Sequence, residues 1–320
     1  MTDRKQTSDL KTSTTKGFRS QGPPDYLHTT RRDEYLPLVA TAALYSRVME
    51  FSGKLNAVPG WLDRVDQICL QEVLTYQSSV DMSGDLLELG VYQGKSAIHL
   101  AHYLSQGESI TVCDLFDEAS SEQTIRADAR HAYRSLSQAT FEKNWLTFFD
   151  KLPTIVRGLS STIVNYVEPS SCRLVHIDAS HMYEHVMQDA VNARSLLLPD
   201  GVVVFDDYRT EHTLGTAAAV WENVISLGLN PVCATRMKFY GTWGDPEPYQ
   251  AIFEKILTTR SDLRLDDYTI CGGRRIVRVI DAGKKSKPKA GIEDENGIKS
   301  ELSTLKKRID RLEAVWNSVS

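Results

Sequence analysis

The pattern of apolar and polar positions over residues 172–208 predicts a strand, a helix and a second strand. Residues 173–178 form a short apolar run that ends on Asp178, and residues 201–207 form a second run that ends on acids. Between the runs, apolar side chains recur at helical spacing, and the Leu-Pro-Asp-Gly sequence at 198–201 ends the helix. A unit of this length implies parallel strands joined by a right-handed crossover, so both carboxyl ends lie at one sheet edge.

Three acids follow these two strands. If the strands are neighbours, they lie about 4.8 Å apart, and Asp178 faces Asp206 and Asp207. Three carboxylates repel one another unless a cation or protons intervene, and all-oxygen ligands suit Mg²⁺ first, then Ca²⁺ or Mn²⁺. The alternative is that Asp206 or Asp207 caps the next turn while Asp178 is solvated. With His181 three residues after Asp178, the spacing favours a cation site.

Residues 85–104 predict a strand, a glycine-bearing turn and a helix. Gly90 and Gly94 mark the turn, which would let a ligand approach the backbone at the start of the helix. A phosphate-binding loop of the type GxxxxGK(S/T) is one residue longer than the spacing found here. A dinucleotide fingerprint requires a glycine where Tyr92 stands. The sequence therefore fits neither phosphate-binding motif well, and it favours a ligand without phosphates.

S-adenosylmethionine is such a ligand, because it carries a positive sulfonium and an amine. Glu88, just before Gly90, suits these charges and would repel phosphates. Asp114 ends the next predicted strand, 109–114, about 20 residues after Gly94, where an acid can bind both ribose hydroxyls. The acids around the glycine turn therefore favour S-adenosylmethionine.

The remaining pattern predicts further helices and strands around this centre. We expect helices at 33–52, 61–79, 123–136, 140–149 and 212–227 and strands at 231–242 and 250–256, with 276–280 as an additional strand. Near the C-terminus, apolar residues alternate spacings of four and three, which is typical of a coiled coil that pairs parallel chains. Its seam is formed by Ile298, Leu302, Leu305, Ile309, Leu312 and Trp316.

Composition narrows the class of protein. The 320 residues carry a net charge of −5, so no global basic bias indicates nucleic-acid binding. The five cysteines are far apart and form no CxxC pair, which argues against a disulfide framework or a zinc site and favours a reducing, cytoplasmic setting. No apolar run approaches the length of a membrane span, and no signal peptide is apparent.

The sequence Glu88-x-Gly90-x-x-x-Gly94, followed by Asp114, resembles the class I S-adenosylmethionine-dependent methyltransferases. The runs at 177–183 (Ile-Asp-x-x-His-x-Tyr) and 205–208 (Phe-Asp-Asp-Tyr) resemble the macrocin O-methyltransferase-like branch, whose members include metal-dependent sugar O-methyltransferases. The resemblance implies an α/β, Rossmann-like fold, with a mostly parallel seven-stranded sheet and helices on both faces.

The resemblance also implies roles for individual residues. His181 would be the general base, and Mg²⁺ would be held by Asp178, Asp206 and Asp207. S-adenosylmethionine would be bound by Glu88, Gly90, Gly94, Ser96, Asp114 and Asp178. The expected activity is O-methylation of a sugar or glycoside hydroxyl on a small-molecule or oligosaccharide acceptor. A catechol-type O-methyltransferase, a P-loop-like ATPase and a non-catalytic coiled-coil scaffold are the alternatives.

The expected domain organisation places one catalytic domain between helical and coiled-coil extensions. It comprises a disordered tail (1–32), N-terminal helices (33–80), the methyltransferase domain (81–282), a linker (283–297) and the coiled coil (298–317). We expect homo-oligomers that assemble through the coiled coil.

Overall fold

The computed structural model describes residues 50–116, 137–270 and 273–283. The chain divides into two units at residue 50, and the fold below belongs to the second unit. The predicted tail, nearly all of the helix at 33–52, the helix at 123–136 and the coiled coil at 298–317 lie outside the described residues. A helix runs through residues 51–57.

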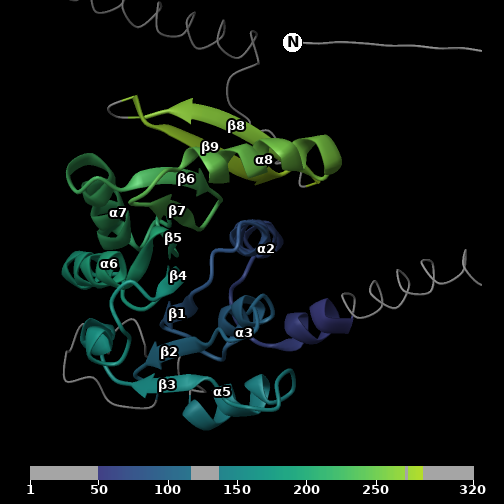
Figure 1. The fold of residues 1–320 in the computed structure, drawn as a ribbon, viewed down its shortest axis with the longest axis vertical. Helices are drawn as coiled ribbons and strands as arrows, with labels where there is room; N and C mark the ends of the chain where they lie inside the picture. Colours follow the sequence, from purple (N-terminus) through teal and green to yellow (C-terminus); the bar gives the residue numbers. More distant parts are fainter. Residues whose placement is uncertain (1–49, 117–136, 271–272, 284–320) are drawn as a thin grey trace, which may run out of the picture. The chain divides into compact units, whose positions relative to one another are not determined.

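The centre of the fold is a nine-stranded sheet with the order β3-β2-β1-β4-β5-β7-β6-β9-β8 (Figure 1). Strands β1 to β5 are parallel, whereas β7 runs antiparallel to both β5 and β6, and β8 runs antiparallel to β9. The strands are β1 (Asp85–Leu89), β2 (Ile110–Asp114), β3 (Thr154–Arg157), β4 (Cys172–Ile177), β5 (Leu197–Phe205), β6 (Asn230–Ala234), β7 (Phe239–Thr242), β8 (Leu263–Thr269) and β9 (Arg275–Asp281). The α/β Rossmann-like class is confirmed, but the expected seven strands are wrong, because β8 and β9 extend the sheet.

Helices cover both faces of the sheet (Figure 1). One face carries α2 (Arg64–Ser79), α3 (Lys95–Ala101), α5 (Gln138–Trp145) and α8 (Glu247–Thr259). The opposite face carries the 3-10 helix η1 (Ser160–Asn165), α6 (Tyr183–Leu196) and α7 (Leu214–Ser226). Each face buries its own apolar core, since side chains alternate along the strands between the two sides.

Two predicted strands have different structures. Residues 231–242 form the hairpin β6–β7 rather than one strand, because the chain turns where Thr235 N–H donates to the Lys238 carbonyl at 2.9 Å. Residues 250–256 belong to α8, in which Tyr249, Phe253 and Ile256 are buried at helical spacing. A short apolar window does not distinguish a strand from a buried helix face.

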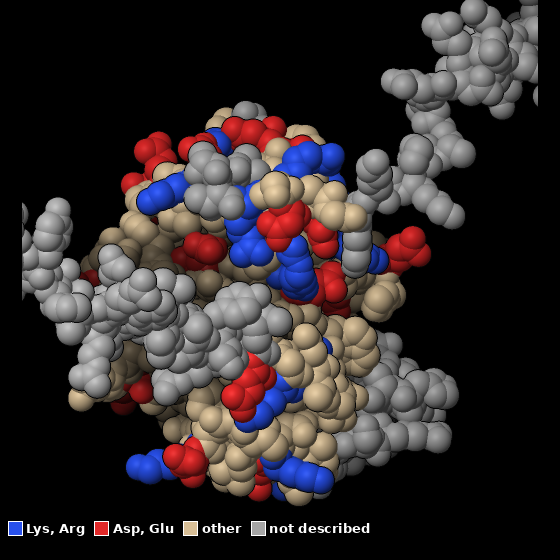
Figure 2. Space-filling view, turned by 90° about the vertical axis from the view of Figure 1, so that its right-hand side faces the viewer, with Lys and Arg blue, Asp and Glu red and all other residues tan. Residues whose placement is uncertain are grey.

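Charged side chains of both signs are interspersed on the face shown in Figure 2. A surface ion pair joins α2 to the outer hairpin, since Arg64 contacts Asp262 just before β8, and Arg260 at the end of α8 contacts the same carboxylate. No helix in the part of the chain that the structure describes is long and apolar enough to cross a membrane.

The topology brings the predicted acids to one edge. Strands β4 and β5 are parallel neighbours with Ile177 opposite Phe205, so the residues that follow each strand leave the sheet side by side. Strand β2 ends at Asp114 on the same edge, two places away from β4. The predicted strand–helix–strand unit and its crossover are therefore confirmed.

Candidate functional site

Asp114 organises the glycine turn through its carboxylate. Its Oδ2 accepts hydrogen bonds from the backbone N–H groups of Val91 at 2.8 Å and Tyr92 at 3.1 Å. Its Oδ1 accepts one from Phe116 N–H at 2.7 Å. Burial raises the pKa of Asp114, although these three hydrogen bonds act in the opposite direction. The predicted ribose-binding acid thus also holds the turn in shape.

Both glycines of the turn lie in the left-handed backbone region. Gly90 has φ +80°, and a Cβ there would lie 2.0 Å from the carbonyl oxygen of Asp178. Gly94 has φ +93°, and a Cβ there would lie 2.8 Å from the Phe141 ring. Ser96 is buried in the first turn of α3. The turn therefore packs directly against the end of β4, which only a residue without a side chain permits.

Glu88 is buried in β1 and paired with His176 on the neighbouring strand β4. His176 Nδ1 lies 2.7 Å from Glu88 Oε1, and both side chains have no exposed surface. Glu88 Oε2 is buried and has no hydrogen-bond partner within the described ranges. His176 is a core histidine, and both of its ring nitrogens have partners. The second oxygen of Glu88 is therefore an unsatisfied acceptor within the described part of the fold.

Lys238, which the sequence analysis missed, lies at the centre of the buried acids. Its ammonium group contacts Asp206 Oδ2 and lies 3.0 Å from His176 Nε2. Burial alone would raise the pKa of Asp206, but the charges of Lys238 and His176, together with hydrogen bonds to Lys238 and Asp178, outweigh it and lower that pKa to about 2. The only sequence signal was a lysine directly before the apolar Phe239 and Tyr240.

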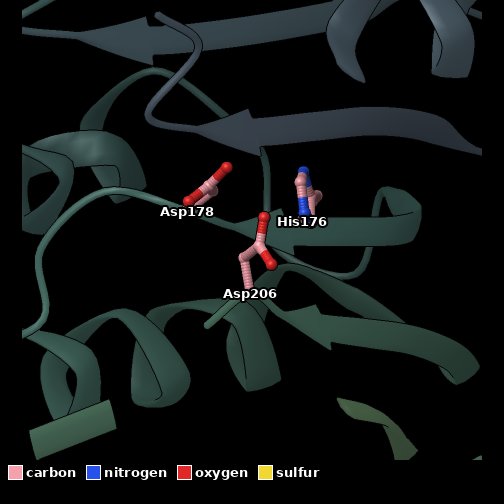
Figure 3. Close-up of side chains that lie close together, drawn as sticks. All are labelled: His176, Asp178 and Asp206. Carbon is pink, nitrogen blue, oxygen red and sulfur yellow. The ribbon is translucent and has the colours of Figure 1, made fainter. Parts of the chain in front are cut away.

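The three predicted metal ligands, Asp178, Asp206 and Asp207, are divided between two overlapping clusters, each of which also contains a histidine. One ligand atom each of His176, Asp178 and Asp206 lies within 4.8 Å of the others, and these side chains converge on one space (Figure 3). Asp178, His181 and Asp207 form the second such cluster, which is half-buried rather than enclosed. Burial, together with the charge of Asp206, raises the pKa of Asp178 well above its ordinary value. Asp178 therefore belongs to both clusters, whereas Asp206 and Asp207 belong to one each.

His181 lies in the more accessible cluster. Its Nε2 is 3.4 Å from Asp207 Oδ2, with exposed fractions of 30% and 22% for the two side chains. A Cβ on Gly215, at the start of α7, would lie 2.3 Å from the His181 carbonyl oxygen, so close packing of α7 fixes the loop. The imidazole of His181 and the carboxylate of Asp207 are thus partly open to solvent, and the loop that carries His181 is held in position.

Ser160 lies after β3, in the first turn of the 3-10 helix η1. Its hydroxyl donates to Asp189 Oδ2 on α6 at 3.0 Å. Asp189 has no exposed surface, and its Oδ1 is without a partner among the residues that the structure covers. Burial raises the pKa of Asp189 to about 7. A buried acid therefore anchors this turn.

The comparisons with known proteins place this arrangement in context. Residues 87–208 match a family model described as a methyltransferase domain. The chain is similar to the structure of the O-methyltransferase NovP, with 15% identity, coverage of 56% of this chain and 81% of that one, and a TM-score of 0.47. It is also similar to CalS11, a TDP-rhamnose 3'-O-methyltransferase of calicheamicin biosynthesis, with 17% identity, coverage of 62% and 93%, and a TM-score of 0.40. No curated protein matches the chain.

The matched segment begins in β1 and ends just after β5, so it contains the glycine turn and every acid of the two clusters. The similarity to a methyltransferase domain therefore covers the part of the Rossmann-like sheet that forms the candidate site.

Proposed function

We propose that this enzyme transfers the methyl group of S-adenosylmethionine to a hydroxyl oxygen of a sugar or glycoside, with a divalent cation at the acidic edge. The observation that carries the proposal is the contact between the glycine turn and the end of β4. Gly90 packs against the Asp178 backbone, and the Asp178 side chain belongs to the cluster with His181 and Asp207. A cofactor in the turn and an acceptor at the cluster would therefore be neighbours.

The proposed cofactor site uses the residues that shape the turn. Glu88 would receive the positive methionine portion at its unpaired Oε2, and Asp114 would face the ribose. Gly90, Gly94 and Ser96 would lie along the backbone that the cofactor meets before and at the start of α3. The Ser160 turn would border the adenine.

The donor set at the acidic edge fits a hard cation. Carboxylate oxygens of Asp178, Asp206 and Asp207 were expected to hold Mg²⁺, and the pKa of Asp178 is raised by burial and by the charge of Asp206, both of which a bound cation would offset. When bound, such an ion would fix two vicinal hydroxyls of an acceptor and make them more acidic.

His181 is the proposed general base. It is half-buried and lies beside Asp207, whose carboxylate would orient the imidazole and stabilise its protonated form. As the acceptor oxygen bonds to the methyl carbon, the carbon–sulfur bond would break and leave a neutral thioether. The proton of the hydroxyl would pass to His181, so the charges balance.

The test is methyl transfer from labelled S-adenosylmethionine to a panel of glycosides and a catechol, each with Mg²⁺ and with EDTA. We expect label on a glycoside only in the presence of Mg²⁺, and little turnover in Asp207→Asn. If only the catechol became labelled, the acceptor would be a phenolic diol and not a sugar. Equal turnover with EDTA would refute the metal requirement.

A further inference from the structure

Lys238 places a full positive charge inside the protein, beside the acids that close β5. It lies in the turn of the β6–β7 hairpin, and its side chain is 1% exposed. Its neighbours come from three other elements: His176 on β4, Asp206 after β5, and Asp66 on α2, whose charge attracts Lys238. A buried ammonium persists only when it is paired and hydrogen-bonded, so this position is built to hold a cation.

Both oxygens of Asp206 already accept a hydrogen bond from within the protein. Oδ2 accepts from the Lys238 ammonium, and Oδ1 accepts from the backbone N–H of Asp207 at 2.8 Å. The Asp207 carboxylate differs, since it is 22% exposed and faces His181 across 3.4 Å. Two consecutive acids therefore have opposite environments, one neutralised inside the fold and one open at its edge.

We propose that Lys238 is the resident counter-ion of Asp206, and that it withdraws Asp206 from divalent-ion binding and leaves the ion to Asp178 and Asp207. This assignment rests on the proposed function, which supplies the divalent ion. It agrees with the usual chemistry of Mg²⁺, which keeps several waters and takes one or two protein carboxylates together with ligand oxygens. Lys238 is then a positioning residue rather than a catalytic one.

The same ammonium connects the acidic edge with the cofactor turn. Lys238 lies 3.0 Å from His176 Nε2, and His176 Nδ1 lies 2.7 Å from Glu88 Oε1. The chain Asp206–Lys238–His176–Glu88 therefore spans β5, β4 and β1 without a solvent-exposed member. Removal of the lysine charge alone would leave Asp206 without its counter-ion inside the fold.

The test compares four full-length variants: Lys238→Met, Asp206→Asn, the double variant with both changes, and Asp207→Asn. Free Mn²⁺, measured by electron paramagnetic resonance, reports ion affinity without any turnover. The midpoint of urea unfolding measures how much the Lys238–Asp206 pair contributes to stability. We expect each single change in the pair to lower the midpoint and the double variant to recover part of that loss, because the charge that each single change leaves without its partner is then removed as well. We expect its Mn²⁺ affinity to stay within threefold of the unmodified protein, and Asp207→Asn to weaken it at least tenfold.

Additive losses in the urea midpoints would overturn the pairing. A loss of Mn²⁺ affinity beyond threefold in the double variant would overturn the withdrawal of Asp206 from the ion site. Unchanged affinity in Asp207→Asn would place the ion elsewhere and overturn the ligand assignment. If the unmodified protein binds no Mn²⁺, the cation of the proposed function fails, while the urea midpoints still decide whether Lys238 neutralises Asp206.

Discussion

Gly90 and Asp178 bring the two halves of the site together through their backbones. The Gly90 N–H donates to the Cys113 carbonyl at 2.7 Å, and the Asp178 N–H donates to the Leu89 carbonyl at 2.8 Å. A Cβ on Gly90 would lie 2.0 Å from the Asp178 carbonyl oxygen. The ends of β1, β2 and β4 are thus packed so closely that the turn and the acidic edge share one piece of backbone.

Gly90→Ala should therefore disrupt both halves. The substitution adds a clash with rigid backbone to the cost of a left-handed conformation, so we expect a loss of about 3 kcal/mol or more in stability. S-adenosylmethionine affinity should fall with it. Gly228→Ala is the matched control, because Gly228 has φ +76° and nothing within 4 Å of a Cβ. Urea unfolding should give only about 1–2 kcal/mol for the control; equal losses would show that the close contact is unimportant.

Asp114→Asn should loosen the glycine turn. An amide keeps one acceptor oxygen, but its NH₂ group faces N–H donors that the carboxylate now satisfies. We expect a loss of about 2 kcal/mol in cofactor binding, or roughly 30-fold in affinity, measured by calorimetric titration of S-adenosylmethionine. The exposed Asp150→Asn serves as the control. Unchanged affinity in Asp114→Asn would contradict the role of this carboxylate.

Asp189 should make stability depend on pH. Burial raises its pKa from 3.8 to about 7, so the folded protein binds a proton that the unfolded chain has released between these values. The contribution of Asp189 to the free energy of unfolding is therefore largest below pH 3.8 and decreases as the pH rises toward 7. The difference is on the order of 4 kcal/mol. Asp189→Asn removes the titration and keeps an acceptor for Ser160.

The variant should therefore gain stability over the unmodified protein as pH rises, with the gain levelling off above pH 7. Chemical denaturation at several pH values from 4 to 8 measures it. A difference between the two proteins that does not vary with pH would show that Asp189 is not buried in its neutral form.

His181→Ala should lower kcat by about 10²- to 10⁴-fold with the cofactor affinity unchanged, because the change removes the proposed base and no contact with the turn. Steady-state kinetics on a glycoside identified by the acceptor panel would measure this loss, and calorimetry would measure S-adenosylmethionine binding. Glu184→Gln, on the exposed first turn of α6, is the control. If kcat of His181→Ala fell by less than tenfold, His181 would not be the general base, and another group would have to accept the proton.

Much of the site was predictable because parallel strands impose simple geometry. Apolar runs that end on acids fix where Asp114, Asp178 and Asp206 leave the sheet, and the crossover rule puts those ends on one edge. The glycine spacing indicated a turn, and in the structure both Gly90 and Gly94 adopt left-handed backbone there. These features depend on local pattern and chain direction alone.

The partner of each acid was not predictable, because it depends on which distant segment packs nearby. Lys238 is 32 residues from Asp206 in sequence and reaches it only because β6 and β7 form a hairpin, where the apolar pattern predicted one strand. The separate environments of Asp206 and Asp207 follow from that contact. Strand β8 was also missed, because an edge strand with exposed polar positions carries a weak apolar pattern.

The C-terminal coiled coil remains a prediction outside the described residues. Removal of residues 298–320 should convert an oligomer to a smaller species in sedimentation, if its apolar seam pairs chains. Methyl transfer should survive, because the proposed site lies wholly within the sheet domain. The scaffold alternative makes the opposite prediction. Under it, the deletion would remove the function of the protein, whereas Asp178→Ala would leave that function intact.

Calorimetric titration of the full-length protein with S-adenosylmethionine, and separately with ATP, tests the central claim most directly. We predict micromolar binding of S-adenosylmethionine that weakens in Asp114→Asn, and no heat from ATP with either Mg²⁺ or EDTA. Binding of ATP alone would mean that the turn from Gly90 to Ser96 holds phosphates, and it would contradict the methyltransferase account.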